Sequence, residues 1–199
     1  MCSSDLSIAD ARAAHAGLAA DGMATTPAID LRRDWVLPSG ETIVPQFSVV
    51  IPAPGQSPLY WNLCQHRTPQ HYVRPEFTRH PNGATRLVAV LAAAPDPPAL
   101  EPHFRRLWKA RRVADAPLSL ATGDVALRVL SPAEAAAAYP GIAIDSATPR
   151  LIGFAVACAD PAGARRHLER AGISAIEGPT GFHVRPEDAA GSLLAFERG

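Results

Sequence analysis

The stretch Arg150–Gly172, RLIGFAVACADPAGARRHLERAG, joins a short apolar strand to a one-sided helix and decides the fold class. Asp160 is placed to cap the helix, Pro161 suits the first helical position, and Gly172 marks the end of the helix. Arg86–Leu100, RLVAVLAAAPDPPAL, repeats the apolar run and the Asp-Pro dipeptide. The chain is therefore expected to contain repeated strand–helix blocks.

Periodicity and turn residues extend this pattern along the chain. We expect helices over residues 8–21, 97–109 and 161–171, the first capped by Ser7 and closed by Gly22. Extended segments follow each helix, and Pro38-Ser39-Gly40 predicts a hairpin within the first set. Each block thus reads as a strand, a helix and then further strands, except that no strand is apparent before the first helix.

Net charge, apolar runs and cysteine spacing exclude several classes of partner and location for this protein. The 199 residues carry no net charge, which disfavours a nucleic-acid backbone or an anionic membrane as partner. No apolar run approaches the ~18 residues of a membrane span. The three cysteines are widely spaced and match neither a metal motif nor a disulfide framework, so we expect a cytoplasmic location. The alanine- and arginine-rich composition is typical of a bacterial source.

The first six residues, MCSSDL, resemble translated adapter sequence rather than a signal peptide. We interpret residues 1–6 as a cloning or assembly scar and expect the natural protein to extend further upstream. Genomic reads in which MCSSDL directly precedes SIADAR would overturn this interpretation.

Chemistry-bearing side chains gather in the connection Cys64–Ala84, CQHRTPQHYVRPEFTRHPNGA. Histidines, arginines, a glutamine and a glutamate alternate there with prolines between two apolar segments. Groups able to ligate a metal or bind an anion therefore lie where one block ends and the next begins.

The order of elements, the strand–Asp-Pro–helix–Gly pattern and the HPNGA before residue 85 resemble the glyoxalase-like domains of the vicinal oxygen chelate superfamily. The resemblance implies an α+β fold of tandem βαβββ modules, with curved, mainly antiparallel sheets and one helix per module. Residues 7–83 would form an incomplete module lacking its first strand, and modules 84–147 and 148–199 would pair.

The same resemblance implies a divalent metal held by His, Gln or Glu from the first and last strands of paired modules. In the two later modules the corresponding positions are Ala89, Gly153 and Ala195, which cannot ligate a metal. In the first module the position matches Gln65, whose alternative role is that of a solvated or backbone-bonding strand-end side chain. Gln65 is accordingly the metal-ligand candidate, with no cofactor as the alternative.

His66 and His71 are the candidate acid/base groups. The alternative is that the histidines of this connection tie two modules together through hydrogen bonds. Cys64 shares a strand face with His66, which makes a nucleophilic thiol conceivable, although a buried apolar role suits a cysteine there.

Arg67 and Arg74 are candidate substrate-binding groups because a guanidinium fork matches a carboxylate or phosphate. They would otherwise pair with Glu76 or stack on nearby aromatic rings. His183 alternates with its apolar neighbours and is a further substrate-binding candidate, with a surface position as the alternative.

Two functions remain open. The resemblance implies metal-assisted lyase, isomerase or dioxygenase chemistry on a small oxygenated molecule; the alternative is a metal-free module that binds a small ligand without turnover. A homodimer is a third expectation, since an unpaired first module would leave a sheet edge exposed.

Overall fold

The computed structural model describes residues 5–121, 123–144 and 147–198, and it divides the chain into two compact units. The first unit is Met1–Thr78 and the second is Arg79–Gly199. Sequence interpretation placed the boundary at residue 83 instead. None of the helices in the described residues is both long and apolar enough to span a membrane.

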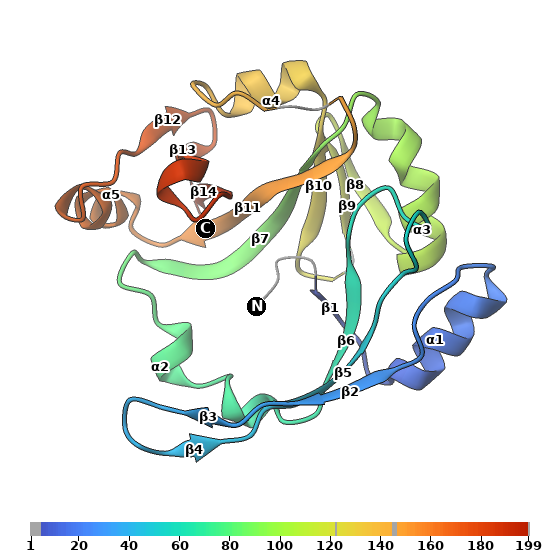
Figure 1. The fold of residues 1–199 in the computed structure, drawn as a ribbon. Coiled ribbons are helices and arrows are strands. Elements are labelled where there is room, and N and C mark those ends of the chain that lie inside the picture. Colours follow the sequence, from blue (N-terminus) through green and yellow to red (C-terminus); the bar gives the residue numbers. More distant parts are fainter. Residues whose placement is uncertain (1–4, 122, 145–146, 199) are drawn as a thin grey trace. The chain divides into compact units, whose positions relative to one another are not determined.

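The first unit is one βαβββ module (Figure 1). Its sheet has the order β1-β6-β5-β2, with β1 parallel to β6 and the other neighbours antiparallel. A small separate hairpin, β3–β4, turns at Gly40, where φ is +85°, as Pro38-Ser39-Gly40 predicted. The elements are β1 Asp5–Ser7, α1 Ala11–Ala20, β2 Ile29–Arg32, β3 Trp35–Val36, β4 Thr42–Ile43, β5 Gln46–Val50, β6 Asn62–His66, the 3₁₀ turn η1 Pro69–His71 and α2 Pro75–Thr78.

The beginning of this module differs from the expectation. A three-residue strand, β1, precedes the first helix and pairs with β6, so a leading strand is present where none was expected. Ser7 belongs to that strand, and the helix is capped instead by Asp10, whose Oδ1 accepts from the N–H groups of Arg12 (2.8 Å) and Ala13 (3.0 Å). Residues 1–4 of the suspected scar lie outside the described residues.

The second unit contains two further modules that share one eight-stranded sheet (Figure 1). The order β12-β13-β14-β11-β7-β10-β9-β8 places the first strands of the two modules, β7 and β11, side by side and antiparallel. The elements are β7 Ala84–Ala93, η2 Pro97–Leu100, α3 Glu101–Trp108, β8 Arg111–Asp115, β9 Leu118–Ala121, β10 Ala126–Leu130, α4 Pro132–Ala138, β11 Arg150–Cys158, α5 Pro161–Arg170, β12 Ile176–Gly178, β13 Gly181–Val184, η3 Pro186–Asp188 and β14 Leu193–Arg198. The predicted α+β class and curved, mainly antiparallel sheets are confirmed.

The two Asp-Pro sites differ in whether the aspartate caps the helix that follows it. Asp160 caps α5 by accepting from Gly163 N–H at 2.9 Å, and Gly172 follows the helix with a φ of +73°. Asp96 makes no such side-chain bond, and a 3₁₀ turn precedes α3 there. The helix in that module is therefore shorter than the predicted 97–109.

Each face of the second sheet carries its own apolar cluster. Side chains of β13, β14 and the end of β11, among them Phe182 and Phe196, pack beneath α5 and its Leu168. On the opposite face, Ala155, Leu193 and Ala195 pack with Ala135 and Tyr139 at the end of α4, alongside Ala89, Leu91 and Leu130. This inner face of the second unit is thus filled by the chain's own side chains.

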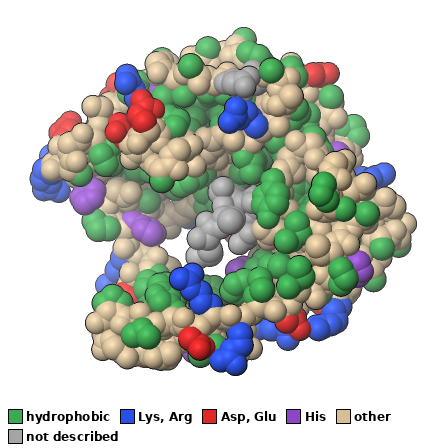
Figure 2. All heavy atoms as spheres, in the orientation of Figure 1, with side chains coloured by type: hydrophobic (Ala, Val, Ile, Leu, Met, Phe, Trp, Pro, Cys, Tyr) green, Lys and Arg blue, Asp and Glu red, His purple; other side chains and the backbone are tan. Residues whose placement is uncertain are grey.

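The face drawn in Figure 2 agrees with the absence of net charge. Acidic and basic side chains are interspersed there among apolar and neutral ones, with no single-sign area over the part shown.

Candidate functional site

Strand β6 presents two chemically different faces in the first unit. Leu63 and Gln65 alternate with Asn62, Cys64 and His66, as the period of two along a strand requires. The Oε1 atom of Gln65 accepts from the backbone N–H of Ala11 at 3.1 Å, so the Gln65 face is the one covered by α1. The polar row Asn62–Cys64–His66 lies on the other face, and we call it the β6 row.

His66 is held by two neighbours on that face. Its Nδ1 atom lies 2.6 Å from the Tyr72 hydroxyl and 4.0 Å from the Cys64 sulfur. Burial, together with the nearby Cys64, raises the pKa of Tyr72, so its hydroxyl stays protonated and donates to Nδ1. Neutral His66 then carries its proton on Nε2, which is left to donate to a bound molecule.

Asn62 adds an acceptor at the other end of the β6 row. Its side chain is 7% exposed, and its Oδ1 atom is buried without a hydrogen-bond partner in the described part of the chain. Buried side-chain oxygens in native proteins are nearly always satisfied, so this atom calls for an explanation such as a missing donor.

Apolar side chains flank the β6 row on the neighbouring strands. Val49 is paired with Cys64, and Phe47 with His66, in the antiparallel register of β5 and β6. The next strand continues the same face with Ile29 and Leu31, which are exposed. An apolar surface with a few polar groups is typical of small-molecule sites.

The other predicted residues of the first unit lie elsewhere. Arg67 donates to Ser48 Oγ at 2.9 Å and to Asp30 at 3.1 Å, which ties three strands together on the α1 side of the sheet. The hydrogen bond from Ser48, followed by the bond from Arg12, keeps the pKa of Asp30 below its usual value. Arg67 therefore lies on the face opposite His66 and does not join the β6 row.

Arg74 and His71 lie beside Glu41 rather than beside His66. Arg74 makes a two-pronged contact with Glu41 (3.1 and 3.0 Å) and bonds Glu76 at 2.7 Å, so the alternative of an Arg74–Glu76 pair is present in the structure. The hydrogen bond from Arg74 lowers the pKa of Glu41, and the charge of His71 adds to this. The substrate-binding role of Arg74 and the acid/base role of His71 stay predictions.

The metal implied by the resemblance was tested against the donors present. Gln65 points toward α1 and His66 away from it, so the two cannot face one ion from the same side of the sheet. Within the described ranges, no three or more His, Cys, Asp or Glu side chains cluster closely enough to hold a metal. Cys64 and His66 supply two donors on one face, short of the usual ligand set, so these residues alone do not fit a metal centre.

The second unit places alanines where the resemblance puts ligands. Ala89, Ala155 and Ala195 are partners across three adjacent strands, and His183 continues the same line on β13. In the antiparallel register of β11 with β7, Ala155 pairs with Ala89 and Gly153 pairs with Leu91. Position 153 requires glycine because the strands approach closely there: a Cβ would lie 1.9 Å from the Leu193 carbonyl oxygen.

His183 is buried, with 1% of its surface exposed, so the surface alternative was wrong. Its Nε2 atom lies 3.1 Å from the Pro140 carbonyl oxygen, to which it donates, and its ring meets Tyr139 edge-on at 5.5 Å. Burial, the largest influence, lowers its pKa. A substrate contact for His183 stays a prediction.

Sequence reasoning missed Asn62 and gave Tyr72 only a stacking role. Reading NLCQH with a period of two would have placed Asn62 on the face of Cys64 and His66. The contact between Tyr72 and His66 depends on the path of the turn η1 between them, which no local pattern encodes.

Comparison with known proteins identifies a family for the chain and solved structures with a similar fold. A family model described as a glyoxalase-like domain matches residues 4–108. No curated protein matches the chain significantly. A hypothetical protein from Staphylococcus aureus matches over 98% of this chain and 65% of its own, with a TM-score of 0.65 and 9% identity. The chain therefore spans just under two thirds of the length of that protein.

Two further solved structures match less of the chain. Methylmalonyl-CoA epimerase from Mycobacterium tuberculosis matches 63% of this chain and 95% of its own (18% identity, TM-score 0.49). The Streptomyces coelicolor methylmalonyl-CoA epimerase matches 58% and 98% (17% identity, TM-score 0.44). At these identities the likeness concerns the fold alone.

Proposed function

Because the chain belongs to the glyoxalase-like domain family, we propose that its first unit binds a small oxygenated organic molecule on the β6 row. The observation that carries the proposal is the Oδ1 of Asn62, which is buried and has no hydrogen-bond partner among the residues that the structure describes, on the same strand face as the His66–Tyr72 pair. A family assignment alone does not give a function, so the argument depends on this site.

The β6 row offers complementary polar groups. Asn62 Oδ1 accepts a hydrogen bond from a ligand hydroxyl, and His66 Nε2 donates one to a ligand carbonyl or carboxylate. Each residue of a strand advances about 3.3 Å, so Asn62 and His66 lie roughly 13 Å apart, which suits an elongated molecule that reaches both ends of the β6 row. The apolar side chains of Phe47 and Val49 cover the carbon skeleton.

The same geometry supports a modest chemical role for His66. Its Nε2–H would stabilise negative charge that develops on a ligand carbonyl oxygen, while the Tyr72 hydroxyl keeps the ring oriented. Such polarisation makes the C–H group next to the carbonyl more acidic.

Metal-assisted lyase, isomerase or dioxygenase chemistry is the second candidate. Its donors on the β6 row are the Cys64 sulfur and His66, whose Nδ1 would have to exchange the Tyr72 hydrogen bond for the metal. The remaining ligands would have to come from outside the described residues. Metal analysis of the purified protein tests this candidate, which requires a stoichiometric metal that His66→Ala releases.

A second copy of the chain is the proposed protein partner. In the second unit, β7 and β11 pair edge to edge, and β1 has the corresponding place in the first sheet. The outer edge of β1 is unpaired in the described residues, so pairing of two β1 edges would extend the sheet across a dimer. Light scattering after size exclusion measures the mass; a monomer at all concentrations contradicts this partner. A cytoplasmic location stays a prediction.

The binding proposal is tested by native mass spectrometry and by thermal shift with a panel of 2-oxo and 2-hydroxy acids. We expect His66→Gln to weaken binding of any stabilising acid about tenfold or more, which corresponds to about 1.4 kcal/mol. His80→Gln, an exposed histidine outside the first unit, is the matched control. Equal binding by both variants would refute the proposal.

A further inference from the structure

A basic segment in the second unit has no part in the β6 row. Residues 105–112, RRLWKARR, contain five cations and no acid. The segment covers the end of α3 and the start of β8, and Lys109 ends the helix in a left-handed conformation with φ +54°. This turn brings cations of the helix alongside cations of the strand.

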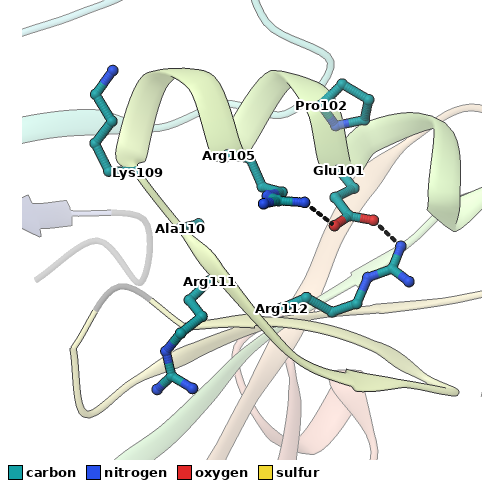
Figure 3. Close-up of a pocket in the computed structure, with 7 residues that line it drawn as sticks. All are labelled: Glu101, Pro102, Arg105, Lys109, Ala110, Arg111 and Arg112. Carbon is teal, nitrogen blue, oxygen red and sulfur yellow. Dashed lines mark hydrogen bonds and ion pairs between the residues drawn. The ribbon is translucent and has the colours of Figure 1, made fainter.

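The segment borders a groove of about 870 Å³. Four cations and one carboxylate line it, so its walls carry net positive charge (Figure 3). Glu101, Pro102, Arg105, Lys109, Ala110, Arg111 and Arg112 form the lining.

A buried carboxylate holds two of these cations. Glu101 is nearly buried at the base of the groove, and it pairs with Arg105 at 3.4 Å and with Arg112. Each guanidinium has five N–H groups, so Arg105 retains donors after bonding to Glu101, and Arg112 retains donors after bonding to Glu101 and, at 2.9 Å, to Asp115. Glu101 thus restrains the side chains that a ligand would meet and reduces the entropy lost on binding.

The cations do not converge on one point. Figure 3 shows Arg105 and Arg112 directed toward Glu101, whereas Lys109 and Arg111 extend away from it in different directions. A single small anion could meet only part of this set. A ligand with two or more linked anionic groups could contact the helix cations and the strand cations together.

We propose that this groove binds a polyphosphate group, either free or carried by a small organic molecule. Guanidinium forks match phosphate oxygens in geometry and charge, and four of the five cations are arginines. The size of the groove lies in the range of small-molecule sites.

Addition of an acidic peptide strand to the edge of β8 fits the structure less well. The pairing of β8 with β9 shifts register between Arg112 and Ala114, and such irregularities twist an edge away from further pairing. Charged side chains along this short strand also disfavour the addition of another strand to its edge. The groove beside the strand therefore favours a compact ligand.

The experiment is calorimetric titration of the whole chain with pyrophosphate at low salt, repeated at about 0.2 M salt. The test variant is Arg105→Ala with Arg111→Ala. The control is Arg166→Ala on α5, because Arg105 and Arg166 are similarly exposed, at 62% and 65%. We expect the double variant to bind at least about tenfold more weakly, the control to match the wild type, and binding to weaken at the higher salt.

Further titrants distinguish the source of the phosphate groups. Equal binding of pyrophosphate and ADP indicates that the polyphosphate alone is recognised, whereas tighter binding of ADP indicates an organic carrier. The proposal is overturned if pyrophosphate at millimolar concentration gives no binding. It is equally overturned if inorganic phosphate binds as tightly as pyrophosphate, or if the double variant matches the Arg166→Ala control.

Discussion

Arg128 on β10 and Glu197 on β14 lie on the last strands of the two modules of the second unit, and they bond to each other across its inner face. Arg128 lies two residues after Ala126, the partner of Ala89 on β7, and Glu197 lies two residues after Ala195, the partner of Ala155 on β11. Their contacts measure 2.5 and 3.3 Å. The last strands of two related modules thus contribute opposite charges to one pair.

The surroundings of this pair are largely dry. The side chains of Arg128 and Glu197 are 21% and 12% exposed. Burial works against the charge of Arg128, but the hydrogen bond and charge of Glu197 outweigh it, so the pKa of Arg128 is raised. Burial also raises the pKa of Tyr139, whose hydroxyl hydrogen-bonds Arg128 as a neutral phenol.

We predict that removal of one partner destabilises the second unit more than removal of both. Glu197→Leu leaves a half-buried guanidinium unpaired and should cost about 2–4 kcal/mol in the free energy of unfolding. Adding Arg128→Met should recover most of that loss, because apolar groups can replace a buried pair. Urea denaturation of the two single variants and the double variant measures this; simple additivity of the single losses would contradict it.

We predict that Asn62→Leu stabilises the first unit while abolishing ligand binding. The substitution removes a buried oxygen that has no partner in the described part of the chain, whose desolvation costs about 1–3 kcal/mol, and keeps a side chain of similar size. The expected gain is up to about 1 kcal/mol in urea denaturation. Gln65→Leu is the matched comparison on the opposite face and should lose stability, because it removes the acceptor for Ala11 N–H. A destabilised Asn62→Leu protein would show that the oxygen has a structural partner.

We predict that His183 makes the second unit less stable in mild acid. Since burial lowers its pKa in the folded state, the unfolded chain binds the proton more readily. The stabilisation from neutral His183 is therefore complete above the unfolded pKa of ~6.5 and is lost as the pH falls below it.

Urea denaturation between about pH 7.5 and 5 measures this dependence. The charge of Arg185 lowers the pKa of His183 further, while the bond to Pro140 opposes the change. His183→Gln should flatten the profile, whereas His80→Gln, an exposed site, should leave it unchanged. Parallel profiles for the wild type and His183→Gln would refute the assignment. Because burial also lowers the pKa of His103, the residual slope should shrink again in His103→Gln.

We predict that Gly153→Ala disrupts the pairing of β11 with β14. The added Cβ would lie 1.9 Å from the Leu193 carbonyl oxygen, so the strands must separate, at a cost of about 2 kcal/mol or more. Gly17→Ala in α1 is the control: its Cβ meets nothing within 4 Å, and it should stabilise the helix by about 0.5–1 kcal/mol. Thermal denaturation compares the two; a neutral Gly153→Ala would contradict the close approach.

Residues at helix ends predicted some element boundaries correctly. Asp160, Pro161 and Gly172 predicted the start and end of α5, since caps and left-handed glycines act through neighbouring backbone atoms. Ser7 failed as a cap because the strand pairing of β1 recruits it, and Asp10 has equally good local geometry for the task.

The candidate site was predicted only in part. Cys64 and His66 were placed on one face from strand periodicity, and the structure has them there. Gln65 and Arg67 were candidates from the same stretch, and both turn toward the α1 side, opposite to His66. Adjacent residues on a strand face opposite ways, so nearness along the chain says little about a shared site.

The sequence by itself determined the repeated strand–helix order after the first helix, the bounds of α5 at Asp160, Pro161 and Gly172, and the alanines at Ala89 and Ala195. These depend on interactions within a few residues and on side-chain periodicity. Only the tertiary structure decided that Arg128 meets Glu197, that Tyr72 orients His66, and that Asn62 is buried without a partner. Such contacts join residues that are far apart in the sequence, so no local pattern indicates them. They depend on how the strands curve and on their register across the sheet.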